Sequence, residues 1–354
     1  MPSVSGFRGR LRAGDLVEVR SREEILATLD ERGMLDNLPL MPEMLRFCGR
    51  QLRVAAVAHK TCDTIERTGM RRMRSAVHLE NVRCDGAAHG GCQAACLIYW
   101  KEAWLKPVAG ETADSERKRQ GPVSSRCDLR ALEEATRVPC AAGKEATYRC
   151  QVTEVLRATT PWAWWSPHHY LLDVCSGNWS LSHVLRVLIL ASLRRMIRTG
   201  VGYRALLALH EWLAPRFGMH PFGEVANQWG PIPRGAPTPG DDVQLNAGDW
   251  VQVRPRAEIL KTLNDGGHNR GMHFDPEMVK YCGGHYRVHR IVRRIIDERS
   301  GRMLEMKNTC VALEGVICQS EYSDRRLMCP RAILPYWRPV WLQKSLPPKD
   351  SESP

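Results

Sequence analysis

The strongest constraint on the fold of this chain is an internal repeat. Residues 13–84 align with residues 247–318 without a gap, at a constant offset of 234, and 26 of the 72 paired positions are identical. After a three-residue insertion the match resumes, from Cys92 paired with Cys329 to Trp104 paired with Trp341. Self-similarity at a fixed spacing is the signature of a duplicated structural unit. The sequence therefore predicts two copies of one fold, each of about 95 residues.

Each copy is predicted to be mostly strand with two short helices. Ser21 and Glu24 have the spacing of a capping box, which predicts that a helix begins at Arg22. Pro42 and Gly49 stand in the order in which proline begins a helix and glycine ends it. Apolar and aromatic-rich runs predict strands in the first copy, and these runs are residues 16–19, 51–58, 76–83 and 97–106.

The first predicted strand of each copy follows a Gly-Asp pair, in Gly14-Asp15-Leu-Val-Glu-Val and again in Gly248-Asp249-Trp-Val-Gln-Val. A small unit that opens with this motif and closes with an aromatic strand resembles the SH3-like barrels of translation and enzyme-accessory proteins. The resemblance concerns the fold alone, because such barrels host many functions. It implies an α+β chain in which two duplicated SH3-like small β-barrels, with short helical insertions, flank a mainly helical middle region.

Composition predicts the boundaries between these parts. Residues 109–126 are polar with glycine and proline, and residues 230–240 contain four prolines, so both segments are interpreted as linkers. The predicted division is a first barrel repeat with the cysteine cluster (1–108), a linker (109–126), a middle region of one strand plus helices (127–229), a Pro/Gly linker (230–246), a second, degenerate barrel repeat (247–345) and a disordered tail (346–354).

Four cysteines of the first copy surround a glycine-rich turn and carry the most specific chemical signal in the chain. Cys92 and Cys96 are separated by three residues, and Cys84 precedes them across a loop that contains three glycines. Cys62 stands at the end of a neighbouring predicted strand. Thiolates bind soft metals, and glycine lets the backbone fold tightly around such a centre. We therefore predict a metal site made of Cys62, Cys84, Cys92 and Cys96.

The second copy indicates which copy holds this centre. Cys62 and Cys96 have no cysteine counterparts, since the aligned residues are Ile296 and Ile333. An apolar residue is what an emptied ligand position becomes when it joins a core. The first copy is thus predicted to bind the metal, and the second to be a degenerate partner.

The spacing favours an iron–sulfur cluster over zinc. Structural zinc sites contain paired cysteine knuckles, and only Cys92 and Cys96 form such a pair here. Three cysteines in a loop and one from a distance are closer to cluster ligation. Additional candidate ligands are Cys150, which could replace Cys84, together with His89 and His59. The centre is expected to serve electron transfer, sensing or structural closure, with a redox or enzyme partner protein.

Charge supports an alternative function. The formal net charge is +12, which favours polyanion binding. A nucleic-acid-binding protein would use the basic segment that contains Arg67, Arg71, Arg72 and Arg74, although no aromatic residues are interleaved with it. A third interpretation is an enzyme or its accessory subunit with a pocket around residues 162–169; the sequence has no nucleotide-binding loop or hydrolase motif that names a reaction.

The expected compartment is the cytoplasm. The N-terminus is basic and lacks the apolar core of a signal peptide, and the best apolar run, residues 187–193, is far shorter than a membrane span. Thirteen cysteines in a long chain without an export signal are expected to be thiols or metal ligands and not a disulfide framework.

Overall fold

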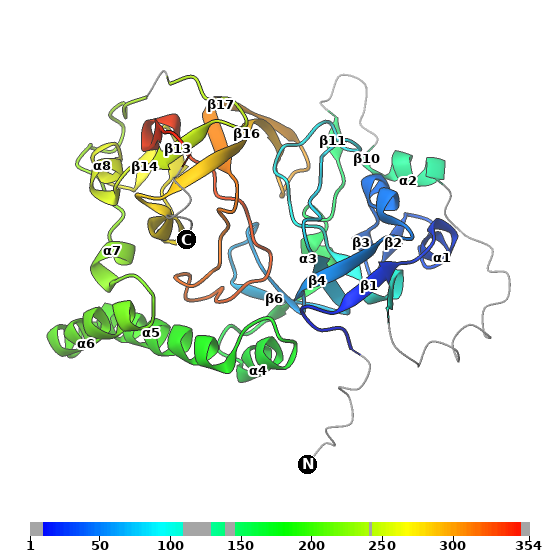
Figure 1. Cartoon of the computed structure of the whole chain (residues 1–354), viewed down its shortest axis with the longest axis horizontal. Helices are drawn as coiled ribbons and strands as arrows, with labels where there is room; N and C mark the ends of the chain where they lie inside the picture. Colours follow the sequence, from blue (N-terminus) through cyan, green and yellow to red (C-terminus); the bar gives the residue numbers. More distant parts are fainter. Residues whose placement is uncertain (1–9, 109–128, 139–145, 241–242, 348–354) are drawn as a thin grey trace, which may run out of the picture. The chain divides into compact units, whose positions relative to one another are not determined.

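The computed structural model describes residues 10–108, 129–138, 146–240 and 243–347 (Figure 1). The predicted linker 109–126 and residues 348–354 of the predicted tail lie outside the described residues. The chain is α+β, as predicted, and it divides into two compact units. The first unit comprises Met1–Val184, Ile296–Leu304 and Cys329–Arg331; the second comprises Leu185–Ile295, Glu305–Met328 and Ala332–Pro354. Two short segments of the second copy therefore belong to the first unit.

The first unit is built on a five-stranded antiparallel sheet. Its strands are β1 (Leu16–Val19), β4 (Gln51–Val57), β7 (Ala76–Leu79), β8 (Trp100–Lys101) and β9 (Leu105–Pro107). They lie in the order β8-β7-β4-β1-β9. A second sheet contains β5 (Lys60–Cys62), β6 (Met70–Met73) and β12 (Thr159–Trp162), with β6 in the centre. Two further pairs are β2 (Met34–Leu35) with β3 (Leu38–Pro39), and β10 (Arg137–Val138) with β11 (Thr147–Tyr148).

Short helices connect these strands. The helices of the first unit are α1 (Arg22–Leu26), α2 (Leu129–Ala135), α3 (Val155–Ala158) and α4 (Pro167–Cys175), with the 3₁₀ helices η1 (Pro42–Phe47) and η2 (Glu102–Trp104). The capping box predicted for α1 is confirmed: Glu24 N donates to Ser21 Oγ at 3.2 Å, and Ser21 N donates to Glu24 Oε2 at 2.8 Å. The predicted strand 97–106 is interrupted, because η2 separates β8 from β9.

The second unit repeats this plan on a four-stranded sheet. Its strands are β13 (Trp250–Val253), β16 (His285–Ile296), β17 (Met303–Leu313) and β18 (Leu342–Lys344), and a short pair joins β14 (His268–Asn269) to β15 (Met272–His273). Its helices are α5 (Leu181–Thr199, of which Leu181–Val184 belong to the first unit), α6 (Tyr203–Arg216), α7 (Phe222–Ala226), α8 (Arg256–Lys261), η3 (Pro276–Tyr281) and η4 (Pro339–Trp341). Within the described ranges, no helix is long and apolar enough to cross a membrane.

The two sheets share strand order and register. The order β17-β16-β13-β18 corresponds to β7-β4-β1-β9 in the first unit. Leu16 lies opposite Arg53 in the first sheet, and Trp250 lies opposite Arg287 in the second, so the constant offset of 234 holds between paired strands. The gapless alignment thus reflects a shared hydrogen-bonding pattern.

The cores also match. Trp104 and Trp341 are fully buried, and each indole donates a hydrogen bond to a threonine of the preceding helical region. Trp104 Nε1 lies 3.0 Å from Thr28 Oγ1, and Trp341 Nε1 lies 2.9 Å from Thr262 Oγ1. A buried indole N–H needs such a partner, so the repeat preserves the tryptophan together with its acceptor.

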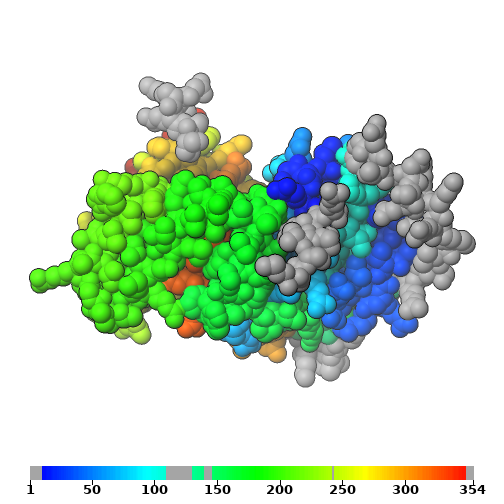
Figure 2. All heavy atoms as spheres, turned by 90° about the horizontal axis from the view of Figure 1, so that it is seen from below, coloured from blue at the N-terminus to red at the C-terminus, as the bar shows by residue number. Residues whose placement is uncertain are grey.

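Helices α5 and α6 contain many exposed apolar side chains. Figure 2 views the face on which these helices lie, drawn in green. Leu185, Ile189 and Met196 on α5, and Leu209 and Trp212 on α6, are all more than two-fifths exposed.

Candidate metal centre

The glycine-rich loop after Cys84 folds into a tight turn. His89 N donates to Gly86 O at 3.2 Å, and Gly91 N donates to the same oxygen at 2.9 Å. Gly86 has φ +76°, and a Cβ atom built on it would lie 2.0 Å from the carbonyl oxygen of Cys92. Only glycine fits this position, and the turn it permits returns His89 toward Cys84.

Replacing Gly86 by alanine is expected to lower the free energy of unfolding by about 2 to 4 kcal/mol, because the added methyl group meets backbone atoms at a left-handed position. Gly91 is the matched control, since its φ is +72° and a Cβ atom added to it would meet no atom within 4 Å. Gly91→Ala is expected to cost about 1 kcal/mol. Chemical denaturation of both variants measures the difference, and equal losses would contradict the steric argument.

Three side chains converge at this turn. Cys84 Sγ lies 3.3 Å from Glu43 Oε1 and 3.3 Å from His89 Nε2, and His89 Nδ1 lies 3.9 Å from Glu43 Oε1. Glu43 comes from the first turn of η1, and the side chains of Glu43 and His89 are almost completely buried. In the part of the chain that the structure describes, this is the one group of three or more His, Cys, Asp or Glu residues whose ligand atoms all lie within 4.8 Å of one another.

Burial disfavours the charged form of all three groups. It raises the pKa of the Glu43 carboxyl and of the Cys84 thiol, and it lowers the pKa of the His89 imidazole. The Glu43 carboxylate further raises the pKa of Cys84. Glu43 Oε2 and His89 Nδ1 are buried and have no hydrogen-bond partner among the described residues. Buried polar atoms without partners are costly, and a bound cation is one way to satisfy them.

The other predicted ligands are not part of this three-residue group, although Cys96 lies close enough to Cys84 to add to the rise in its pKa. Cys62, Cys92 and Cys150 are buried, and neither they nor Cys96 belong to a described ligand group with Cys84. The main chain still links Cys84 to Cys96, whose carbonyl accepts a hydrogen bond from Cys84 N at 2.9 Å.

Cys62 has a neighbour that the sequence did not predict. Cys62 N donates to Cys329 Sγ at 3.0 Å, within the first unit. The alignment identifies Cys329 only as the counterpart of Cys92. Cys92 Sγ in turn accepts a hydrogen bond from Ile296 N at 3.3 Å. Both contacts depend on the two segments of the second copy that belong to the first unit.

His59 lies in a different buried group. Its Nε2 atom is 3.2 Å from Asp173 Oδ1, and Lys60 Nζ is 2.5 Å from Asp173 Oδ2. His59 is therefore a candidate for another site and not a member of the group around Cys84.

Strand β6 buries one arginine of the predicted basic segment and exposes the next. The Arg71 side chain is buried and donates to Thr159 and to the carbonyl oxygen of Leu156. Arg67, Arg72 and Arg74 are exposed. Arg71 thus has a structural role, and the surface that the segment offers to a polyanion is smaller than the sequence suggested.

Glu43 is the site residue that sequence reasoning missed. A signal was present, because Pro42-Glu43-Met44 recurs as Pro276-Glu277-Met278. Glu277 is also buried, and burial raises its pKa to about 7. Burying a glutamate costs free energy, so its presence at the buried helix start of both copies is not explained by packing alone.

The second copy lacks the complete group. Cys318 corresponds to Cys84, but residues 319–328 contain no histidine. The Glu277 carboxylate instead accepts a hydrogen bond from Tyr322 N at 2.6 Å. The carboxylate and the thiol are retained, and the imidazole is specific to the first copy.

Comparison of the chain with protein-family models, curated proteins and solved structures finds no match.

Proposed function

We propose that this chain is a metal-binding protein and that its first copy holds one divalent transition-metal ion at Glu43, Cys84 and His89. The observation that carries the proposal is the convergence of these three buried side chains, with unpartnered atoms on Glu43 and His89. Each copy, on the same proposal, is an SH3-like barrel, which is supported by the Gly-Asp start and the shared strand order.

Ligand chemistry favours zinc at this group. Zinc accepts thiolate sulfur, imidazole nitrogen and carboxylate oxygen together, whereas iron–sulfur clusters are held mainly by thiolates. Magnesium and calcium prefer oxygen ligands alone. The ligands come from η1 and from the loop after Cys84, so a bound ion would tie this loop to the helix. We therefore propose structural closure as the role of the ion.

The predicted iron–sulfur cluster is the second candidate. It is favoured by the buried thiols of Cys62, Cys92, Cys150 and Cys329 in the first unit. Burial raises the pKa of Cys150 to about 11, with Cys92 adding to the effect, and it raises the pKa of Cys96 to about 12. Against a cluster, these sulfurs do not form a compact ligand group among the described residues.

Metal analysis of protein purified without oxygen tests both candidates. We expect about one zinc ion per chain and no visible absorption band. Cys84→Ser and His89→Gln are expected to lose the zinc. Cys318→Ser is the matched control, because Cys318 occupies the equivalent position in the second copy, and it is expected to keep the full content. Circular dichroism establishes that each variant is folded.

Other outcomes decide against the zinc proposal. Iron and sulfide in the parent protein, lost on replacement of Cys62 and Cys96, would establish the cluster instead. Full zinc content in folded Cys84→Ser would show that Cys84 is not a ligand.

A further inference from the structure

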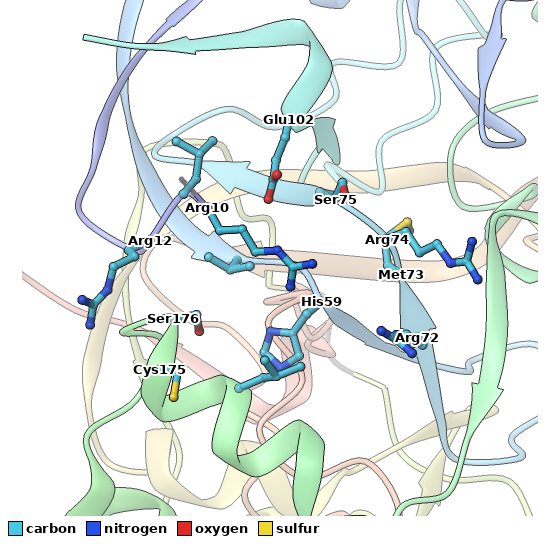
Figure 3. Close-up of a pocket in the computed structure, with 14 residues that line it drawn as sticks. Arg10, Arg12, His59, Arg72, Met73, Arg74, Ser75, Glu102, Cys175 and Ser176 are labelled. Carbon is cyan, nitrogen blue, oxygen red and sulfur yellow. The ribbon is translucent and has the colours of Figure 1, made fainter. Parts of the chain in front are cut away.

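A second feature of the first unit is a pocket of about 380 Å³ that shares no lining residue with the group of Glu43, Cys84 and His89 (Figure 3). It is lined by the segment before β1, by the end of β4 and the turn before β5, by β6 and the turn that leads to β7, by η2 and by the end of α4. All of its lining residues belong to the first unit. A volume of this size lies within the range of pockets that bind small molecules.

The walls of this pocket are strongly cationic. Arg10, Arg12, Arg72 and Arg74 line it, and all four side chains are exposed. None of them has a carboxylate within 4.0 Å in the described part of the chain. Glu102 is the one acidic residue of the lining. Figure 3 shows Arg12 and Arg74 at opposite edges of the pocket, with Arg10 and His59 nearer its middle.

Two side chains of the lining, Arg72 and His59, are held in position. The Arg72 guanidinium lies over the Trp162 ring, 5.3 Å from its centroid. The His59 ring is fixed by the fully buried Asp173, at 3.2 Å, and Asp173 is in turn paired with Lys60. His59 Nδ1 is buried and has no hydrogen-bond partner among the described residues. Groups that are already oriented lose little conformational entropy when a ligand binds.

We propose that this pocket binds a small organic phosphate of roughly mononucleotide size. The guanidinium group matches phosphate geometry with paired N–H donors, which makes arginine the preferred residue for such ligands. The lining holds four arginines and one carboxylate, which gives the excess of positive charge that a phosphate monoester requires. The size of the pocket favours a small molecule over a polymer. This inference does not depend on the proposed metal centre.

Isothermal titration calorimetry tests the proposal with adenosine 5′-monophosphate and ribose 5-phosphate, each compared with its unphosphorylated form. We expect the phosphates to bind with a Kd below ~1 mM and the adenosine and ribose controls to bind far more weakly. Arg72→Gln and Arg10→Gln are each expected to weaken binding about tenfold, the effect of losing a charge-assisted hydrogen bond. Arg67→Gln is the matched control, because Arg67 is exposed in the same basic segment but does not line the pocket.

Three results would overturn the proposal. Absence of binding for both phosphates at ~1 mM would exclude the ligand class. Equal weakening by Arg67→Gln and Arg72→Gln would show general electrostatic attraction and no specific pocket. Tight binding of a single-stranded oligonucleotide that depends equally on Arg67 and Arg72 would identify an open polyanion surface instead.

Discussion

Replacement of Asp173 by alanine is expected to lower the free energy of unfolding by about 3 to 5 kcal/mol, the usual cost of breaking a buried ion pair from one side. The side chains of Lys60 and Asp173 are completely buried, with Nζ and Oδ2 2.5 Å apart. Alanine at position 173 removes the carboxylate and leaves the Lys60 amino group fully buried without its anionic partner. Burial already lowers the pKa of Lys60, and Asp173 opposes that effect.

Two further variants separate the contribution of the Lys60–Asp173 ion pair from other effects on stability. Glu134→Ala removes a partner of Arg130 in an exposed pair whose atoms are 3.9 Å apart, and it is expected to change stability by less than ~0.5 kcal/mol. The double variant Lys60→Met/Asp173→Leu replaces the pair by apolar side chains and is expected to recover much of the loss. Denaturant unfolding measures all three, and a loss below ~1 kcal/mol for Asp173→Ala would contradict the argument.

The stability of Asp173→Ala is also expected to depend on pH. Without Asp173 the folded state favours the neutral amine of Lys60, whereas the unfolded chain keeps it protonated up to about pH 10. The unfolded state then binds more protons, so the stability of Asp173→Ala is expected to rise with pH across the alkaline range, relative to the parent.

The sequence predicted β1, β4 and the start of β7, and the repeat carries register information, but the sheet of β5, β6 and β12 was not predicted. A gapless alignment over two copies requires that paired strands keep their spacing, and the pairs Leu16–Arg53 and Trp250–Arg287 show that they do. Trp104 and Trp341 could likewise be predicted as core residues, since each recurs with an aromatic neighbour at fixed spacing.

The alignment alone could not predict that parts of the second copy belong to the same compact unit as the first copy. Residues 296–304 and 329–331 align with the first copy as if they completed the second, yet they belong to the first unit. Their placement depends on contacts such as Cys62 N with Cys329 Sγ, which join residues 267 positions apart. No local pattern encodes such a contact, so cysteine spacing alone grouped Cys84 with Cys92 and Cys96.

Glu43, a ligand of the proposed metal site, could not be predicted from the sequence for a related reason. A glutamate in the first turn of a helix has an ordinary explanation, namely its favourable interaction with the helix dipole. Only its burial, and its distance of 3.3 Å from a sulfur atom 41 residues later in the chain, distinguish it from a surface residue.

Zinc affinity is expected to fall steeply as the pH is lowered. Burial holds the pKa of Cys84 far above its ordinary value, so the metal-free site contains the thiol. Only the thiolate binds zinc, and each ion that binds must therefore release the Cys84 proton. The affinity is then expected to change about tenfold per pH unit from about pH 6 to about pH 8. Burial lowers the pKa of His89, so its imidazole gives up its proton more readily than an exposed one and contributes less to this slope.

Competition with a chromophoric chelator at several pH values measures this slope, and calorimetry in buffers of different ionisation enthalpy counts the protons released. Burial also raises the pKa of Glu43, so Glu43→Gln is expected to reduce proton release at the acidic end as well as affinity. Cys318→Ser should keep the slope of the parent, because the second copy lacks the imidazole ligand. A zinc affinity that is independent of pH in this range would show that no buried thiol is deprotonated on binding, and Cys84 could then not be the ligand.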